Sequence, residues 1–171
     1  MLTPRLPGGW DARLADDRLL AIYLNDHLGG SAAGRDRCRH AARRYRGSAL
    51  GAFLAGLLAE IEEDRATLLR LIGRVGARPS KVKQALGVAA ERVGRLKPNG
   101  TLGGHSPLTP FIELEALSLG VEGKRLLWEG LGGLADPRLS EFDFVELAER
   151  ATAQRVGIER HRLAAGRNAF G

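Results

Sequence analysis

Apolar residues recur every three or four positions along most of this chain, and no segment alternates cleanly between apolar and polar residues. A repeat near 3.6 residues places apolar side chains on one face of an α-helix, whereas a half-buried strand needs a period of two. The sequence therefore predicts an all-α protein. The expected helices are four long ones at about 11–46, 48–75, 109–131 and 140–169, and a short one at about 80–95.

Turn and capping residues mark the expected helix ends. Glycine is common just after a helix, whereas serine and threonine hydroxyls accept hydrogen bonds from the first free backbone amides. Asp143 follows Ser140 by three residues, in a shortened form of the capping box. The predicted stops are Gly47, Gly76 and Gly132, and the predicted caps are Ser48, Thr109 and Ser140.

Length and composition favour a single domain spanning 1–171. The chain has 171 residues, 44% of them hydrophobic, which is enough to bury a substantial core. No apolar run reaches the roughly 18 residues that a membrane span needs, and residues 1–7 lack the apolar core of a signal peptide. We therefore expect a cytoplasmic protein with no membrane partner.

Cys38 is the single cysteine of the chain. One thiol cannot form an intrachain disulfide or a thiolate zinc cluster. Cys38 lies on the apolar side of the first expected helix, so we interpret it as an unreactive packing thiol.

The formal charge of +6 raises the question of an anionic partner, and the densest basic run lies at 35–46. At 100° per residue, Arg35, Arg39, Arg43 and Arg46 share one helix face, opposite Cys38. No aromatic platform, zinc finger or helix-turn-helix accompanies this face. We interpret it as a solvated stripe and expect no nucleic-acid partner.

The lengths of the connections predict how the helices are joined. Short links after the first and third long helices predict two antiparallel hairpins, and roughly 30 residues between the hairpins allow an end-to-end crossover. Polar residues fall near the middle of each long helix, in Tyr23–His27, in the acidic run Glu60–Asp64, at Glu115 and Glu122, and in Glu146–Glu149. With these features the chain resembles a divergent member of the ferritin-like superfamily, over nearly its whole length.

The resemblance implies a bundle that binds two metal ions through carboxylates. Such sites take one glutamate from each of two helices and a Glu-x-x-His pair from each of the other two. This chain contains no Glu-x-x-His, and its nearest substitutes are Glu60-x-x-Glu63 and Glu146-x-x-Glu149. We therefore expect a scaffold that has lost the standard di-metal site.

Several ionisable residues fall on or beside the apolar stripes of the long helices. His27 lies at the centre of the first stripe, and Asp64 lies inside the second, after Ile61. On the third helix we take the stripe of Leu119 and Leu126 as the buried one. The predicted inward set is His27, Asp64 and Glu122, with Glu60, Glu115 and Glu149 as further candidates.

Two interpretations of this set remain open. In the first, it binds iron or manganese, which both accept oxygen-rich sites completed by an imidazole. His27 and Glu122 would be terminal ligands and Asp64 or Glu60 would bridge, giving a protein able to oxidise ferrous iron.

In the second interpretation the set is a buried hydrogen-bond network. His27 would donate to Asp64 or Glu122, and Arg65 or Arg125 would neutralise the excess charge. Such a network can fix helix register without adding net stability. None of the four histidines has a serine or cysteine in a recognisable nucleophile setting, so hydrolytic chemistry is not expected.

Two apolar faces exceed what a four-helix core requires. The 80–95 segment is amphipathic and basic, and we expect it to pack across the bundle with the face of Val82, Ala85, Leu86, Ala89, Val93 and Leu96. The third long helix carries a second stripe, which a second copy of the chain or the 80–95 segment should cover. That stripe consists of Leu114, Leu117, Val121 and Trp128. We favour a homodimer because a large aromatic residue such as tryptophan often anchors interfaces.

Overall fold

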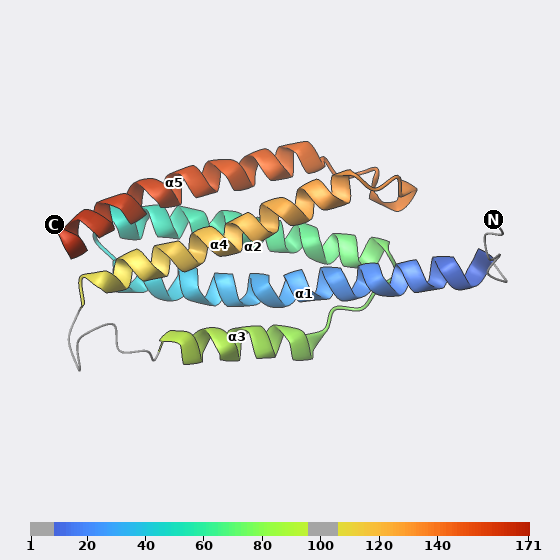
Figure 1. Cartoon of the computed structure of the whole chain (residues 1–171), viewed down its shortest axis with the longest axis horizontal. Coiled ribbons are helices and arrows are strands. Elements are labelled where there is room, and N and C mark those ends of the chain that lie inside the picture. Colours follow the sequence, from blue (N-terminus) through green and yellow to red (C-terminus); the bar gives the residue numbers. More distant parts are fainter. Residues whose placement is uncertain (1–8, 96–105) are drawn as a thin grey trace, which may run out of the picture.

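The computed structural model describes residues 9–95 and 106–171, with side chains from 16–92 and 106–171. Every regular element in these ranges is helical, which confirms the all-α class (Figure 1). None of the helices described there combines the length and apolarity needed to cross a membrane. The expectations for residues 1–7, and for the side chains of Val93 and Leu96, lie outside the described residues. The elements are α1 Gly9–Arg44, α2 Ala49–Arg74, α3 Lys81–Arg95, α4 Leu108–Gly132, the 3-10 helix η1 Pro137–Leu139 and α5 Phe144–Phe170.

Glycines end the first two helices as predicted. Gly47 and Gly76 have positive φ angles of 84° and 72°, a backbone conformation that glycine adopts without strain. The Ser48 hydroxyl accepts a hydrogen bond from the Gly51 amide at 3.1 Å, which begins α2. These contacts confirm the tight turn between α1 and α2.

Two predicted helix caps, Thr109 and Ser140, are wrong. Helix α4 begins at Leu108, whose amide donates to the Ser106 hydroxyl at 3.3 Å, so Thr109 is already inside the helix. Helix α5 begins at Phe144, and its cap is Asp143, which accepts from the Glu146 amide at 2.9 Å. Residues just before Ser140 form η1 instead, because the Asp136 carboxylate caps that shorter turn.

The long helices form two hairpins that pack against each other. Helix α1 lies beside α2, and α4 lies beside α5, while α1 also contacts α4 and α2 contacts α5. In Figure 1, α1 and α5 run toward the left, whereas α2 and α4 run toward the right. Helix α3 lies along the outside of α1 and, in Figure 1, runs from near the middle of the molecule toward the left end, where α4 begins.

The core lies between the two hairpins. The apolar stripe that α4 turns toward it is not the one that we predicted. Leu114, Leu117, Val121 and Trp128 are at most 4% exposed, whereas Leu119 is 70% exposed. The stripe that we expected to be surplus is therefore the buried one. The physical reason is the charge pattern, because burying the other stripe would take Glu115 and Glu122 out of water.

Helix α3 also presents a different face from the one predicted. It packs on α1 with Gln84, Gly87 and Glu91, while Val82 and Leu86 are 68% and 63% exposed. A Cβ atom on Gly87 would overlap the carbonyl of Gly29, so the two backbones meet more closely than ordinary side chains permit. Because α3 lies on α1, it does not cover the apolar stripe of α4, and that expectation was wrong.

Polar contacts hold α3 in this position. The buried Asn25 donates to the Arg78 carbonyl at 3.1 Å and accepts from the Ser80 amide at 2.6 Å. Lys83 pairs with Asp26, and Arg37 pairs with the buried Glu91 at 3.2 Å. These contacts favour the polar face of α3 over its apolar face.

Candidate functional site

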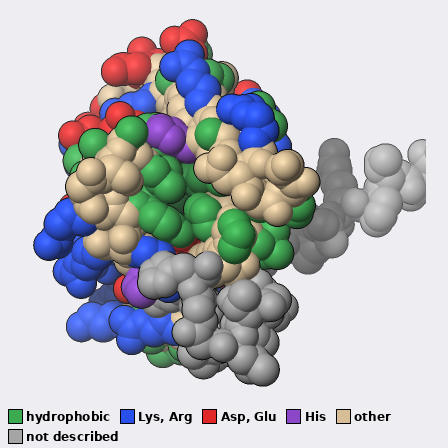
Figure 2. Space-filling view, turned by 90° about the vertical axis from the view of Figure 1, so that its left-hand side faces the viewer, with side chains coloured by type: hydrophobic (Ala, Val, Ile, Leu, Met, Phe, Trp, Pro, Cys, Tyr) green, Lys and Arg blue, Asp and Glu red, His purple; other side chains and the backbone are tan. Residues whose placement is uncertain are grey.

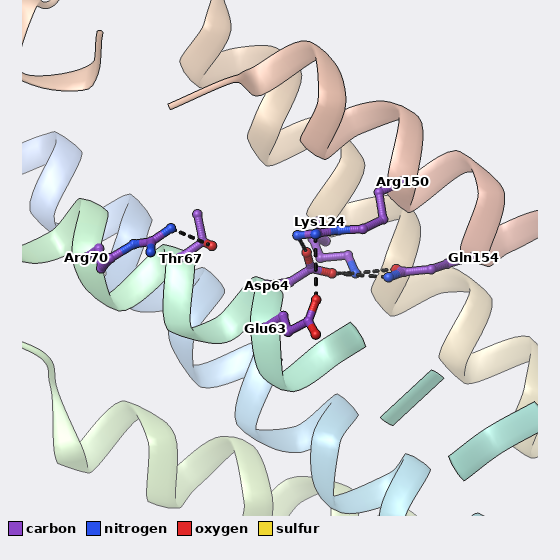
Figure 3. Close-up of polar contacts among 7 residues, drawn as sticks. All are labelled: Glu63, Asp64, Thr67, Arg70, Lys124, Arg150 and Gln154. Carbon is purple, nitrogen blue, oxygen red and sulfur yellow. Dashed lines mark hydrogen bonds and ion pairs between the residues drawn. The ribbon is translucent and has the colours of Figure 1, made fainter. Parts of the chain in front are cut away.

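The most buried charged group of the described residues is Asp64, at the middle of α2 and 2% exposed. It follows Ile61 on the buried side of that helix, as predicted. Lys124 reaches it from α4, and Arg150 and Gln154 reach it from α5 (Figure 3). We call these four residues the Asp64 cluster.

Both carboxylate oxygens of Asp64 accept hydrogen bonds. Arg150 donates to Oδ1, and Lys124 donates through Nζ to Oδ2. Gln154 donates through Nε2 to the same Oδ2 at 3.2 Å, and its Oε1 accepts a second hydrogen bond from Lys124. The cluster therefore joins α2 to both helices of the other hairpin.

Burial and charge oppose each other at Lys124. Burial lowers the pKa of this ammonium below its ordinary value, while the Asp64 carboxylate raises it and Glu60 adds a smaller favourable field. Arg150 lowers the pKa further as a like charge. Arg150 also lies 3.8 Å from the exposed Glu63, which points to the rim of the cluster (Figure 3).

The sequence contains a signal for Lys124 that we did not use. Lys124 follows Leu117 by seven residues and Val121 by three, so it shares the buried face of α4. Gln154 likewise lies between Ala151 and Ile158, which are both fully buried. A long lysine or glutamine in an apolar stripe indicates a buried polar partner on a neighbouring helix.

His27 has a different environment from the one expected. It is partly buried, and its ring packs edge-on against Tyr23, with ring centroids 4.6 Å apart. Burial lowers the pKa of the imidazole, and the neighbouring Asp26 partly offsets this. The donors to Asp64 are the lysine, arginine and glutamine described above. The network interpretation instead had His27 donating to Asp64 or Glu122.

The predicted glutamates are spread over the molecule. Glu122 lies on the outer side of α4, where it accepts from Arg125 at 2.7 Å and pairs with Arg155 at 2.8 Å. The hydrogen bond from Arg125 is the main cause of the lowered pKa of Glu122. Glu115 and Glu149 are exposed, so their inward placement was wrong, and Glu60 is partly buried.

The six predicted metal ligands therefore do not converge. Within residues 16–92 and 106–171, no three histidine, cysteine, aspartate or glutamate side chains lie close enough together to hold a metal ion. The arginine expected beside Glu122, Arg125, is indeed its partner. Arg65 instead donates to the Ser31 hydroxyl at 2.7 Å and to Gln84.

Another buried carboxylate lies where α1 meets α4. Glu113 is 6% exposed and accepts a hydrogen bond from the Tyr45 hydroxyl at 2.8 Å, with Arg44 at 3.8 Å. Burial and this carboxylate raise the pKa of Tyr45. The pair links the two hairpins near the end of α1.

Cys38 is the packing thiol that we predicted. Its side chain is fully buried, and its Sγ lies 3.4 Å from the Leu54 carbonyl oxygen. Burial raises the pKa of the thiol to about 12. The thiolate needed for nucleophilic or redox chemistry is therefore disfavoured.

An open hollow of about 640 Å³ lies beside the turn between α1 and α2. Arg39, Arg43 and Arg46 line it, together with small apolar residues, and the Ser48 hydroxyl in its lining already caps α2. Figure 2 shows this end of the molecule, with hydrophobic side chains at the centre and lysines and arginines toward the edge. Arg39 pairs with Glu62 at 2.7 Å, so one of the three arginines already has a carboxylate partner.

Comparison with protein families, with characterised proteins and with solved structures found no match to this chain. Function is therefore inferred from two features, the Asp64 cluster and the exposed faces of the helices. In that cluster, charged and amide groups from two helices hydrogen-bond to one buried carboxylate on a third.

Proposed function

We propose that this protein is a non-catalytic, ferritin-like helical scaffold in which internal cations take the place of a metal centre. The observation that carries the proposal is that both carboxylate oxygens of Asp64 already accept hydrogen bonds, one from Arg150 and one from Lys124. A metal-binding carboxylate needs a free oxygen lone pair and neighbouring ligands that are not cationic. A divalent ion at Asp64 would have to displace or repel both cations.

The order of the helices supports the ferritin-like assignment. Two hairpins, with α3 as an end-to-end crossover between them, give the up-down-down-up order of that superfamily (Figure 1). The absence of Glu-x-x-His from the sequence supports the loss of the standard site. The role left for the bundle is to hold its outer surfaces in a fixed arrangement.

Metal analysis tests this proposal directly. The full chain, purified without chelator, is incubated with ferrous iron or manganese, desalted and measured by elemental analysis. We expect substoichiometric metal and ferrous oxidation at the rate of buffer alone. Stoichiometric metal that is lost in Asp64→Asn or Glu122→Gln would overturn the proposal in favour of a low-histidine iron or manganese protein.

The cluster also makes a prediction about stability. Asp64→Asn leaves two partly buried cations facing a neutral amide. Removing one partner of a buried ionic group typically destabilises by about 3 kcal/mol. The neighbouring Glu63→Gln is the matched control, because Glu63 is exposed and should change the free energy of unfolding by about 0.5 kcal/mol or less. Urea unfolding measures both, and equal effects would contradict the structural role of Asp64.

A further inference from the structure

The outer face of the α4–α5 hairpin carries two rows of exposed apolar side chains. Ile112, Leu119 and Leu126 lie on α4 at intervals of seven residues, and Val156, Leu163 and Phe170 lie on α5 at the same interval. Their exposed fractions run from 37% for Ile112 to 71% for Phe170. We call these six residues the α4–α5 outer face.

Such regular exposure is unusual for a surface that faces only water. Single exposed apolar residues are normal, but two aligned rows form a continuous patch, and spacing by sevens is typical of a seam between helices. The core side of both helices is already filled, since Trp128 and Ile158 are buried. The exposure of the six side chains shows that no described part of the same chain covers this face.

The charges beside the two rows have opposite signs. On the outer side of α4, Glu115, Glu122 and Glu129 accompany Arg125. The outer side of α5 is mainly basic. It carries Arg155, Arg160, Arg162 and Arg167, with Glu149 and Glu159. Some of these charges are paired within one copy, Glu122 with Arg155 and Arg162 with Glu159. The net charge is still negative along the outer side of α4 and positive along that of α5, so the face complements a copy of itself.

We propose that the α4–α5 outer face binds a second copy of this chain, with α4 of each copy lying on α5 of the other. A two-fold axis parallel to the helices produces this arrangement and brings the acidic row of each copy to the basic row of the other. A two-fold axis across the helices would instead stack α4 on α4, with glutamates facing glutamates. The charge pattern selects the first geometry.

The positions of the side chains along the helix axes, which we call their heights, fit this geometry. Glu122 pairs with Arg155 at 2.8 Å, and the Phe111 and Phe170 rings lie 5.4 Å apart, which fixes how α4 and α5 are aligned within one copy. Leu119 then lies at a height between Val156 and Leu163. An axis parallel to the helices preserves heights, so Leu119 of one copy falls between these two residues of the other. This is the interlocking expected of a helix seam.

The oligomeric state of the full chain tests the proposal. Light scattering and sedimentation velocity at micromolar concentration should give a dimer of the 18.4 kDa chain. We expect Leu119→Glu to raise the dimer dissociation constant at least tenfold. The control is Leu86→Glu, because Leu86 on α3 is similarly exposed and should leave the dimer unchanged. Circular dichroism checks that each variant is folded.

A monomer at all concentrations would overturn the inference, and so would a dimer that resists Leu119→Glu or dissociates with Leu86→Glu. The proposal for Asp64 is tested by metal content and does not depend on these outcomes, because Asp64 is buried whereas the six residues of the α4–α5 outer face are exposed.

Disulfide cross-linking tests the geometry. The native Cys38 is buried, so cysteines introduced at positions 119 and 163 react without interference. Under mild oxidation, a mixture of Leu119→Cys and Leu163→Cys chains should form mixed disulfides, and either chain alone should form few. Efficient cross-linking of Leu119→Cys alone would overturn the proposed geometry, because Leu119 is the middle residue of its row and would meet itself if α4 lay on α4.

Discussion

Cys38 and Tyr45 hold their protons more tightly in the folded chain than a free thiol or phenol does. Burial is the main cause at both residues, and at Tyr45 the Glu113 carboxylate adds to it. A group whose folded-state pKa is raised stabilises the fold below its unfolded pKa and loses that stabilisation as the pH rises. Both residues therefore make the fold sensitive to alkali.

The pKa values of Cys38 give the pH range over which this stabilisation is lost. The pKa of its thiol rises from an ordinary value of 9.0 to about 12, so its contribution is complete below pH 9 and is lost toward pH 12. Between pH 8 and pH 10.5 the loss should be about 2 kcal/mol, at 1.36 kcal/mol per pKa unit. Urea unfolding at the two pH values measures it.

Cys38→Ala is the comparison that isolates the thiol. It should be less stable at pH 8 because it loses packing, but it should lose less stability between pH 8 and pH 10.5. Tyr45 and Lys124 titrate in both proteins, so the difference between the two slopes belongs to Cys38. Identical slopes would show that the thiol ionises without penalty.

Asp64 and Glu122 show how far single residues could be predicted. The position of Asp64 after Ile61 in one clear apolar stripe was sufficient to place it in the core. Glu122 lies in one of two competing stripes on α4, and hydropathy alone favoured neither. The desolvation of two glutamates decided between them. The partners of Asp64 depend on that choice, so the cluster could not be assembled from the sequence.

At the level of elements, α3 shows that the most apolar face of a helix is not always the buried one. Gly87 and Gly29 let α3 and α1 approach within backbone contact, and the buried Asn25 fixes the chain just before α3. Helical periodicity predicted where α3 lies in the sequence and which residues share a face. It could not predict the docking, because that depends on polar partners distant in the sequence.

Gly87→Ala should therefore loosen α3. Its new methyl group would overlap the Gly29 carbonyl, which belongs to a rigid helix backbone. Overpacking of this kind costs about 1–3 kcal/mol. We expect faster hydrogen exchange of the amides in 81–95, with α4 and α5 unaffected.

Gly30→Ala is the matched control on α1. A Cβ atom there would meet nothing within 4 Å, and alanine favours a helix over glycine by about 0.5–1 kcal/mol. This variant should be as stable as the parent chain or more so. Equal slowing or equal acceleration of exchange in the two variants would contradict a glycine contact between α3 and α1.

At the scale of the whole molecule, polar contacts join the two hairpins at intervals along their length. Tyr45 and Glu113 meet where α1 ends, and the Asp64 cluster lies near the middle. At the other end, Arg74, the last residue of α2, pairs with Glu141. The lengths of the connections predicted which helices would be neighbours, α1 with α2 and α4 with α5. The face that each hairpin turns to the other depends on these contacts between residues far apart in the sequence.

The contacts at the two ends of the hairpins, Tyr45 with Glu113 and Arg74 with Glu141, should differ in strength because one is partly buried and the other is exposed. Tyr45→Phe removes the hydroxyl that donates to Glu113 and leaves a buried carboxylate with Arg44 at 3.8 Å. An unsatisfied buried acceptor costs about 1–3 kcal/mol, so the midpoint of urea unfolding should fall. Arg74→Gln breaks an ion pair between exposed side chains and should leave the midpoint unchanged within error. If Arg74→Gln lowered the midpoint as much as Tyr45→Phe, the hairpins would be held together by surface charge, and raising the salt concentration should then separate them.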